Sequence, residues 1–323
     1  MPGFITHLFF GKQAIHSLEN NKLDRILNNH SCAFSLGLQG PDFFFYYIPS
    51  YFLHSKNIGS VIHNKNVMLF FDNLLNARND LDNVIEKRIA DAYICGFIGH
   101  YTLDTTCHPY VYYRSNHFKA LQQGKTYDFG NHVTLETDID HVVLAHFAHV
   151  KPTEFDYAKA IGVTPQEQDV ICFLLEEAIN NTFLDANITY SEISKAISSF
   201  IALNRIMNDP TGNKKRIVRT LEECIMHHPF ISSMVPSDKH IKFKDPCNIA
   251  HNTWCNPWAP EIKSSASVFD IMNDAIPVFI DRLSIYYNSV NENLDEDIND
   301  IVHYRNKLLE NLSDISYTRG LPL

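Results

Sequence analysis

The stretch Gly99-His100-Tyr101-Thr102-Leu103-Asp104-Thr105-Thr106-Cys107-His108-Pro109 carries more information than any other part of this chain, because it places a histidine, an aspartate and a second histidine at steps of four. Residues four apart lie on nearly the same face of an α-helix, so His100 and Asp104 would point into a common space. A proline disfavours helical geometry at the residue before it, so we expect the helix to end at His108, with its ring turned toward a neighbouring site. The stretch therefore predicts a helix that carries a cluster of nitrogen and oxygen donors.

A second pair with the same spacing follows at His132 and Glu136. Zn²⁺ takes about four such ligands at roughly 2.0 to 2.2 Å, and side chains that project from facing helices can supply them. Two pairs of this kind imply more than one metal ion. The alternatives are an exposed helical pair, which contributes only tenths of a kcal/mol, or a buried histidine paired with a carboxylate. The apolar run Tyr93–Gly99 indicates a central helix for the first pair, where an unpaired aspartate would be costly.

Length and charge limit the possible functions. With 323 residues the chain can form one large or two ordinary domains and bury a core without disulfides, so a metal would serve chemistry more than folding. The formal net charge is −10, from 27 basic and 37 acidic residues, which argues against stable binding to a nucleic-acid backbone. A compact site with bound cations could still recruit an anionic substrate.

The cysteines and the N-terminus indicate a reducing compartment. The seven cysteines are scattered and contain no C-x-x-C pair, which is typical of free thiols. The first ten residues lack the basic region of a signal peptide, and no run of about 18 apolar residues occurs that could span a membrane. We therefore expect a cytoplasmic protein without a transmembrane segment.

Apolar residues recur mostly at helical spacing, with little of the strict alternation of a half-buried strand, so the expected fold is all-α. The predicted helices cover residues 12–29, 58–77, 81–107, 131–149, 165–182, 191–207, 214–228, 264–288 and 297–312. Thr164 and Pro165 are a typical N-cap and first helical residue. The helical pattern is interrupted just after residue 150. We therefore expect one helical domain over 1–150 and an additional helical region of unknown role over 151–323, either separate or packed as one body.

Five sequence elements, taken in order, resemble the zinc-dependent phospholipase C family, an all-helical group that is also similar to the single-strand-specific zinc nucleases. The elements are Thr6-His7, Gly40-Pro41-Asp42, Gly59-Ser60-Val61-Ile62-His63 and the two pairs described above. All of them fall within residues 1–150. The resemblance implies a multi-helical phospholipase C-like bundle, here with additional C-terminal helices. It also implies a small phosphate ester or a phospholipid headgroup as the substrate.

Carried over residue by residue, the resemblance implies the ligands of two or three zinc ions. One zinc would be held by Asp42, His63, His100 and Asp104. A second would be held by His108, His132 and Glu136, with a place left for water or substrate. A third would share Asp104 and use His7 and the α-amino group of the chain. His108 follows Asp104 by four residues, whereas the better-known members have this histidine six residues after the aspartate, where this chain has Tyr110.

Several residues near these elements have more than one interpretation. Asp42 is a zinc ligand and also the general base, if it takes the role of its matching position in the family. His54 is a nearby alternative to His63. The aromatic run Phe43–Tyr47 could hold a quaternary ammonium group by cation–π attraction, although burial in the core is the simpler interpretation. Asp140, one turn beyond Glu136, could bind or orient a ligand, cap a helix or face solvent.

The function predicted on this basis is a metal-dependent phosphodiesterase that uses zinc-activated water for in-line attack on phosphorus. Two alternatives stay open: a nuclease or nucleotidase that uses the same metals, and a helical binding module without catalysis. The acidic charge counts mildly against single-strand binding. The sequence lacks H-D, H-E-x-x-H and G-x-S-x-G motifs and glycine-rich phosphate loops, which mark other hydrolases and nucleotide-binding proteins.

Overall fold

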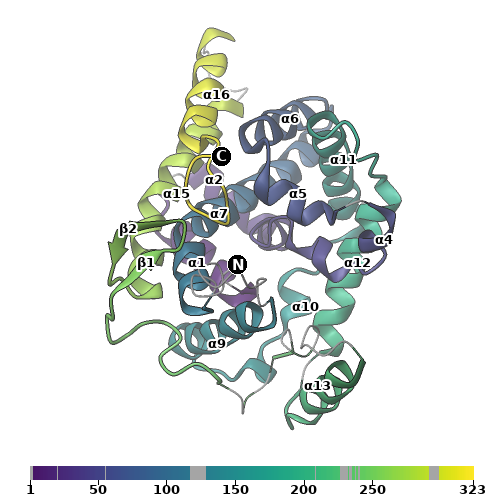
Figure 1. The fold of residues 1–323 in the computed structure, drawn as a ribbon. Helices are drawn as coiled ribbons and strands as arrows, with labels where there is room; N and C mark the ends of the chain where they lie inside the picture. Colours follow the sequence, from purple (N-terminus) through teal and green to yellow (C-terminus); the bar gives the residue numbers. More distant parts are fainter. Residues whose placement is uncertain are drawn as a thin grey trace.

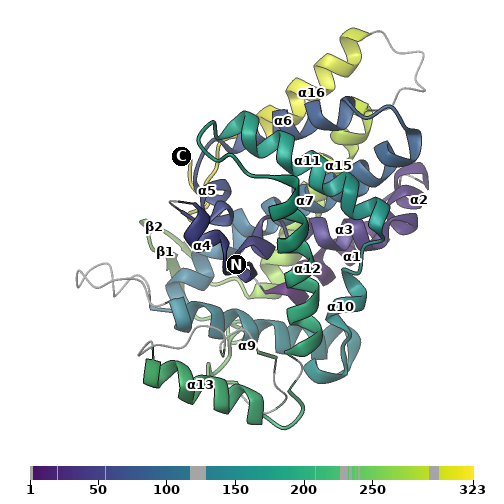
Figure 2. The same cartoon turned by 90° about the vertical axis from the view of Figure 1, so that its right-hand side faces the viewer.

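The structure, a computed structural model, describes residues 3–19, 21–54, 56–116, 129–207, 209–225, 241–290 and 298–323, together with residues 232, 235, 236 and 238. Within these residues the fold is all-α, as the sequence predicts, apart from one two-stranded sheet. Many of the other helices pack against one long helix, α7 (Val84–Arg114), which crosses the middle of the molecule in Figure 1 and Figure 2.

Helix α7 is 31 residues long and is buried along most of its length. It begins where the side chain of Asn83 accepts a hydrogen bond from the backbone amide of Ile85, an ordinary N-cap. The middle turns of the helix carry apolar and small residues on every face, which is typical of a helix in the centre of a core. The helix therefore holds His100 and Asp104 away from solvent.

The predicted end of this helix at His108 is wrong. The helix continues through Pro109 and ends only at Arg114. A proline inside a helix removes one backbone hydrogen bond, and here the complete burial of Tyr110 and Val111 in the following turn offsets that loss. His108 consequently lies on the helix rather than beyond it.

The elements before residue 150 are mostly short helices. They are α1 (Phe4–His16), α2 (Asn21–Asn29), α3 (Ser31–Gly37), the 3-10 helix η1 (Asp42–Tyr46), α4 (Ser50–Leu53), α5 (Ile58–Asn64), α6 (Val67–Asn79) and α9 (Phe129–Ala148). Two predicted helices are divided. The one over 12–29 is α1 and α2, and α1 starts earlier than expected, at Phe4. The one over 58–77 is α5 and α6, separated at Asn66, whose φ of 50° is incompatible with a continuous right-handed helix.

The elements after residue 150 are longer helices and one hairpin. They are η2 (Pro152–Glu154), α10 (Tyr157–Ala160), α11 (Pro165–Thr182), α12 (Tyr190–Ile206), α13 (Asn213–Ile225), β1 (Trp254–Asn256), β2 (Ala259–Ser264), α15 (Val268–Val290) and α16 (Ile298–Leu312). The start of α11 is confirmed, because Thr164 caps it and Pro165 is its first residue. The sequence did not predict the antiparallel pair β1–β2. Four of the six residues of β2 are exposed, so this strand lacks the alternation of apolar and polar residues that marks a half-buried strand.

Two glycines allow α3 to pack directly on α7. A Cβ atom at Gly37 would lie 2.1 Å from the carbonyl oxygen of Tyr93, and one at Gly96 would lie 2.2 Å from the carbonyl oxygen of Phe34. The two backbones are therefore in contact. This contact fixes the turn after α3, which leads to Asp42.

One buried hydrophobic cluster contains side chains from both sides of residue 150. Helix α11 packs on α6 and α7, and α15 packs on α1, α7 and α16. The described helices on either side of this point thus share a core, while the domain boundary near residue 150 stays a prediction.

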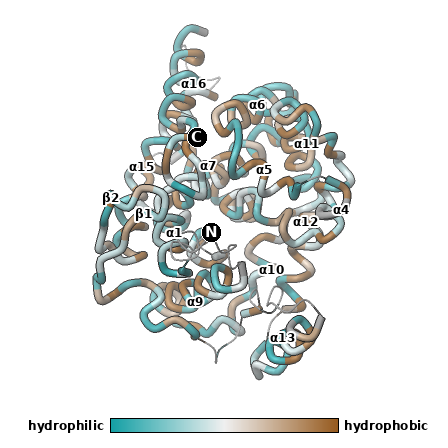
Figure 3. Tube along the Cα trace, viewed as in Figure 1, coloured by the Kyte–Doolittle hydropathy of each residue, from teal (hydrophilic) through white to brown (hydrophobic). Residues whose placement is uncertain are grey.

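Helices α13 and α16 lie at opposite edges of the molecule, as both Figure 1 and Figure 2 show. The end of α16 that extends furthest from the other helices is mainly hydrophilic in Figure 3. Among the helices that the structure describes, none combines the length and the hydropathy needed to cross a bilayer.

Candidate metal centre

Five of the predicted ligand side chains converge beside the middle of α7 and form what we call the first cluster. His7 comes from α1, Asp42 from η1, His63 from α5, and His100 and Asp104 from α7. All five side chains are buried, with exposures of 7% or less. Ligand atoms of His7, His100 and Asp104 lie within 4.8 Å of one another, and so do those of Asp42, His63 and His100.

The Asp104 carboxylate lies at the centre of the first cluster. Its Oδ1 is 3.1 Å from Nε2 of His7, and its Oδ2 is 3.3 Å from Nε2 of His100 and 3.5 Å from Nε2 of His63. Oδ2 is also 3.6 Å from Nδ1 of His108. Burial by itself raises the pKa of Asp104, but the surrounding histidines, His108 and His100 first, hold it well below its usual range. Asp104 is therefore ionised while fully buried.

Asp42 reaches the cluster because the chain turns sharply before it. Its Oδ1 is 3.3 Å from Nε2 of His63 and 3.9 Å from Nε2 of His100. Gly40 in this turn has a φ of +51°, and a Cβ there would lie 2.1 Å from Cδ2 of His100. Only glycine combines that backbone conformation with such a close approach to the imidazole, which explains the glycine of the Gly40-Pro41-Asp42 element.

The second cluster consists of His108 from α7 and His132 and Glu136 from α9. The ligand atoms of the three residues lie within 4.8 Å of one another, and Nε2 of His132 is 2.6 Å from Oε1 of Glu136. Exposures of 2% to 6% place this cluster inside the protein as well. The contact between His108 and Asp104 joins the second cluster to the first.

Three histidines are oriented by backbone carbonyl groups. Nδ1 of His63 is 2.6 Å from the carbonyl oxygen of Gly59, and Nδ1 of His100 is 3.2 Å from that of Leu38. Nδ1 of His108 is 2.6 Å from the carbonyl oxygen of Tyr317. A hydrogen bond from Nδ1–H leaves Nε2 with its lone pair directed into the cluster, which is the usual support of metal-binding histidines.

The two clusters fit divalent cations. Five of their atoms are buried and have no hydrogen-bond partner within the described residues; they are Oδ1 of Asp42, Oδ2 of Asp104 and Nε2 of His63, His100 and His108. Burying such groups without a partner costs on the order of 1–3 kcal/mol each, and more for charged groups. A cation at each cluster would satisfy these atoms together, and imidazole with carboxylate is a donor set suited to zinc.

The pKa of His63 also indicates a site for positive charge. Although burial lowers its pKa, the adjacent carboxylates of Asp104 and Asp42 raise it to about 9. In the absence of a cation, a proton on His63 thus supplies positive charge beside these two carboxylates. A metal ion would take over that role.

The predicted alternatives near the clusters have structural roles. His54 lies outside both clusters, with Nε2 3.0 Å from Oε1 of Glu192. Phe43 and Phe44 are completely buried in the core, as the simpler interpretation expected. The α-amino group proposed for a third zinc lies outside the described residues.

Asp140 caps helix α1. Its carboxylate accepts hydrogen bonds from the backbone amides of Ile5 and Thr6 and from the Thr6 hydroxyl, at 2.6 to 2.9 Å. A Cβ at Gly3 would lie 2.3 Å from Oδ2 of Asp140, so the chain passes very close to the carboxylate. Because His7 directly follows Thr6, Asp140 positions a residue of the first cluster from α9. Sequence spacing left this role open among several.

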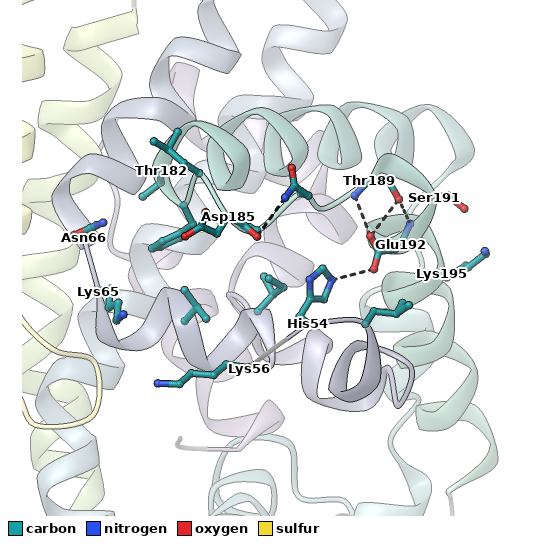
Figure 4. A pocket seen from close by; sticks show the side chains of 17 residues that line it. His54, Lys56, Lys65, Asn66, Thr182, Asp185, Thr189, Ser191, Glu192 and Lys195 are labelled. Carbon is teal, nitrogen blue, oxygen red and sulfur yellow. Dashed lines mark hydrogen bonds and ion pairs between the residues drawn. The ribbon is translucent and has the colours of Figure 1, made fainter.

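Two cavities differ in whether they reach the metal-binding clusters. A cavity of about 990 Å³ opens between α4, α5 and the loop from α11 to α12, and none of the eight predicted ligands lines it. Figure 4 shows His54 and Glu192 in the wall of this cavity, with the His54 ring pointing toward the Glu192 carboxylate. A cavity of about 70 Å³ is lined by Glu136 together with Tyr46, Tyr157 and Asp140, and it reaches the second cluster.

The carbonyls of Leu38 and Tyr317 are parts of the site that the sequence did not reveal. A backbone carbonyl has no residue signature, so no pattern could have found them. The spacing by four, in contrast, predicted that His100 lies beside Asp104 and that His132 lies beside Glu136.

Comparison with known proteins agrees with this geometry. The family described as zinc dependent phospholipase C matches residues 6–195, which extends past the limit near residue 150 expected from the sequence. No curated protein and no solved structure matches the chain. The match covers more than half of the chain and includes every residue of the two clusters. This protein therefore belongs to the zinc-dependent phospholipase C family.

Proposed function

We propose that the protein is a zinc-dependent phosphodiesterase that hydrolyses a phosphate ester in the manner of a phospholipase C. One observation carries the proposal: eight side chains, drawn from α1, η1, α5, α7 and α9, meet as two joined and buried clusters of imidazoles and carboxylates. The proposed ligands are His7, Asp42, His63, His100, Asp104, His108, His132 and Glu136. Two zinc ions account for the two clusters, and the triad of His7, His100 and Asp104 offers donors for a third.

The chemistry proposed for the centre combines bound zinc with one carboxylate. Zinc, when bound, supplies a Lewis acid for the phosphoryl oxygens and lowers the pKa of bound water toward about 7. Asp42 is proposed as the general base that accepts a proton from the attacking water. Its side chain is 9% exposed whereas that of Asp104 is fully buried, so Asp42 is nearer to arriving water. The Gly40 turn and the carbonyl of Leu38 keep Asp42 and His100 in place.

The proposed substrate is a small phosphate ester or a phospholipid headgroup. The family match supports this class, and bound cations in an otherwise acidic protein would attract an anion. Cleavage of single-stranded nucleic acid would need an additional basic groove with stacking aromatics. We therefore rank a nuclease second and a non-catalytic binding module third.

The decisive experiment compares substrates on protein purified without added metal and analysed for zinc. We expect zinc to be bound and a chromogenic phosphocholine ester to be cleaved faster than a plain phosphodiester or single-stranded DNA. His100→Ala should abolish turnover, whereas His54→Ala, a histidine outside both clusters, should preserve it. Protein that holds no stoichiometric zinc, or equal turnover by His100→Ala, would rule the proposal out.

A further inference from the structure

The C-terminal segment Ser313–Leu323 is part of the wall of the metal centre. It folds back on itself through hydrogen bonds from the amide of Ser316 to the carbonyl of Leu321 and from the amide of Leu323 to the carbonyl of Asp314. It is the last part of the chain, and 209 residues separate Tyr317 from His108, which it contacts. The segment therefore brings residues from far beyond the predicted ligands to the site.

Helix α7 holds this segment at two places. The hydroxyl of Tyr101 lies 2.8 Å from the carbonyl oxygen of Leu312 and 3.2 Å from that of Ile315. Gly320, with a φ of +61°, lies against the turn of α7 that contains Pro109, and a Cβ there would be 2.3 Å from the carbonyl oxygen of Thr105. That carbonyl is the one whose helical partner Pro109 removes, so the proline of α7 and the glycine of the segment meet.

Tyr317 is the residue of this segment that reaches both clusters. Its ring centroid is 4.8 Å from that of His63 and 5.9 Å from that of His100, which belong to the first cluster. Its carbonyl oxygen accepts the hydrogen bond from Nδ1 of His108, which belongs to the second. Its side chain is fully buried. Tyr317 thus touches proposed ligands of both clusters through different atoms.

The Tyr317 hydroxyl has no hydrogen-bond partner in the described part of the chain. A buried hydroxyl without a partner destabilises the folded state, so its presence calls for a reason other than packing, which phenylalanine would serve equally well. The carboxylates of Asp42 and Asp104 belong to the same cluster as His63 and His100, which the Tyr317 ring contacts, yet neither carboxylate accepts the proton of this hydroxyl. A neutral hydroxyl beside a cation site can donate a hydrogen bond to an anionic oxygen of a ligand that binds there.

We propose that Tyr317 is a further residue of the active site, whose hydroxyl donates a hydrogen bond to a phosphoryl oxygen of a phosphate ester bound at the two clusters. The proposal rests on the proposed function for the identity of the substrate. The backbone of Tyr317 positions His108, and its side chain touches the substrate. Within residues 151–323, the segment Ser313–Leu323 would then take part in catalysis through Tyr317.

The test uses the full-length, zinc-loaded protein with Tyr317→Phe, which removes only the hydroxyl. The ring contacts and the carbonyl that orients His108 stay in place. Tyr286→Phe is the matched control, because it removes another buried hydroxyl, one bonded to Asp91 and far along the chain from any predicted ligand. For each protein we would measure zinc content, the affinity for inorganic phosphate by calorimetry, and kcat and KM for the phosphocholine ester.

We expect Tyr317→Phe to keep its full zinc content, to bind phosphate about tenfold more weakly, and to lose about 100-fold in kcat. Tyr286→Phe should match the unaltered protein in all three. Equal phosphate affinity of Tyr317→Phe and the unaltered protein would overturn the proposal. Loss of zinc from Tyr317→Phe would overturn it too, because the hydroxyl would then support the metal rather than the substrate.

The two proposals fail in different ways. If the unaltered zinc protein hydrolyses none of the esters, the proposed function fails. The comparison of phosphate affinities would still decide whether the Tyr317 hydroxyl contacts a bound phosphate.

Discussion

Nδ1 of His108 lies 2.6 Å from the carbonyl oxygen of Tyr317. This hydrogen bond places the proton of the His108 ring on Nδ1, so the buried Nε2, which has no hydrogen-bond partner among the described residues, keeps its lone pair for a cation. It also makes the geometry of the second cluster depend on the C-terminal segment Ser313–Leu323. The proposed ligand His108 thus owes its orientation to Tyr317, a residue that no local sequence pattern connects with it.

Gly320→Ala should weaken zinc binding at the second cluster. The added Cβ would lie 2.3 Å from the carbonyl oxygen of Thr105 in a backbone conformation that costs about 1–3 kcal/mol for a side-chain-bearing residue, so the segment must move off α7. Zinc titration by calorimetry should show one weakened site. Gly212→Ala is the control, because Gly212 also has a positive φ, of 74°, but precedes α13 at the edge of the molecule. Equal zinc binding by both variants would contradict this dependence.

Asp104→Asn should reduce zinc binding more than any change at the edge of the clusters. Asp104 contacts His7, His63 and His100 and is the negative charge at the centre of the first cluster. Asparagine has nearly the same shape, so the loss reports charge rather than volume. We expect at least one zinc fewer per chain by elemental analysis and ester hydrolysis reduced by about 100-fold or more. Asp274→Asn, at an exposed position of α15, should change neither.

Removing zinc should lower the melting temperature. Without cations the carboxylates of Asp42, Asp104 and Glu136 stay buried among imidazoles. A ligand present at about 1,000 times its Kd stabilises the folded state by about 4 kcal/mol, so chelation should remove stability of that order. Differential scanning calorimetry with and without a chelator measures the change, and adding zinc back should restore it. A melting temperature indifferent to chelation would mean that the clusters hold no metal.

Asp140 should make stability fall as the pH rises from about 4 to about 6. Burial, which outweighs the hydrogen bonds from Thr6 and Ile5, raises the pKa of its carboxyl to about 6 from an ordinary 3.8. The folded state therefore binds this proton more tightly than the unfolded chain, and the advantage is complete below pH 4 and lost above pH 6. The difference of about two pKa units corresponds to about 3 kcal/mol. Urea unfolding of Asp140→Asn at several pH values should show a flatter profile, and Asp274→Asn the original one.

The sequence predicted the all-α class and the two pairs spaced by four because these features depend on local spacing. The other members of the clusters, His7, Asp42, His63 and His108, were assigned through the resemblance to the family. A step of four residues brings His100 onto the face of Asp104, and His132 onto that of Glu136, wherever the helix lies. The same local reasoning failed at Pro109. A proline removes one hydrogen bond from a helix, but burial of the next turn against distant segments outweighs that loss. No residue close to Pro109 in the sequence indicates this burial.

Local sequence is therefore enough to identify the pairs of imidazoles and carboxylates that stand at helical spacing. The direction in which these donors point depends on contacts between distant parts of the chain. The carbonyls of Leu38 and Tyr317, the carboxylate cap supplied by Asp140 and the glycine contact at Gly40 all join parts of the chain that are distant in sequence. Backbone groups are the same in every residue, so their positions arise only from the packing of the whole chain.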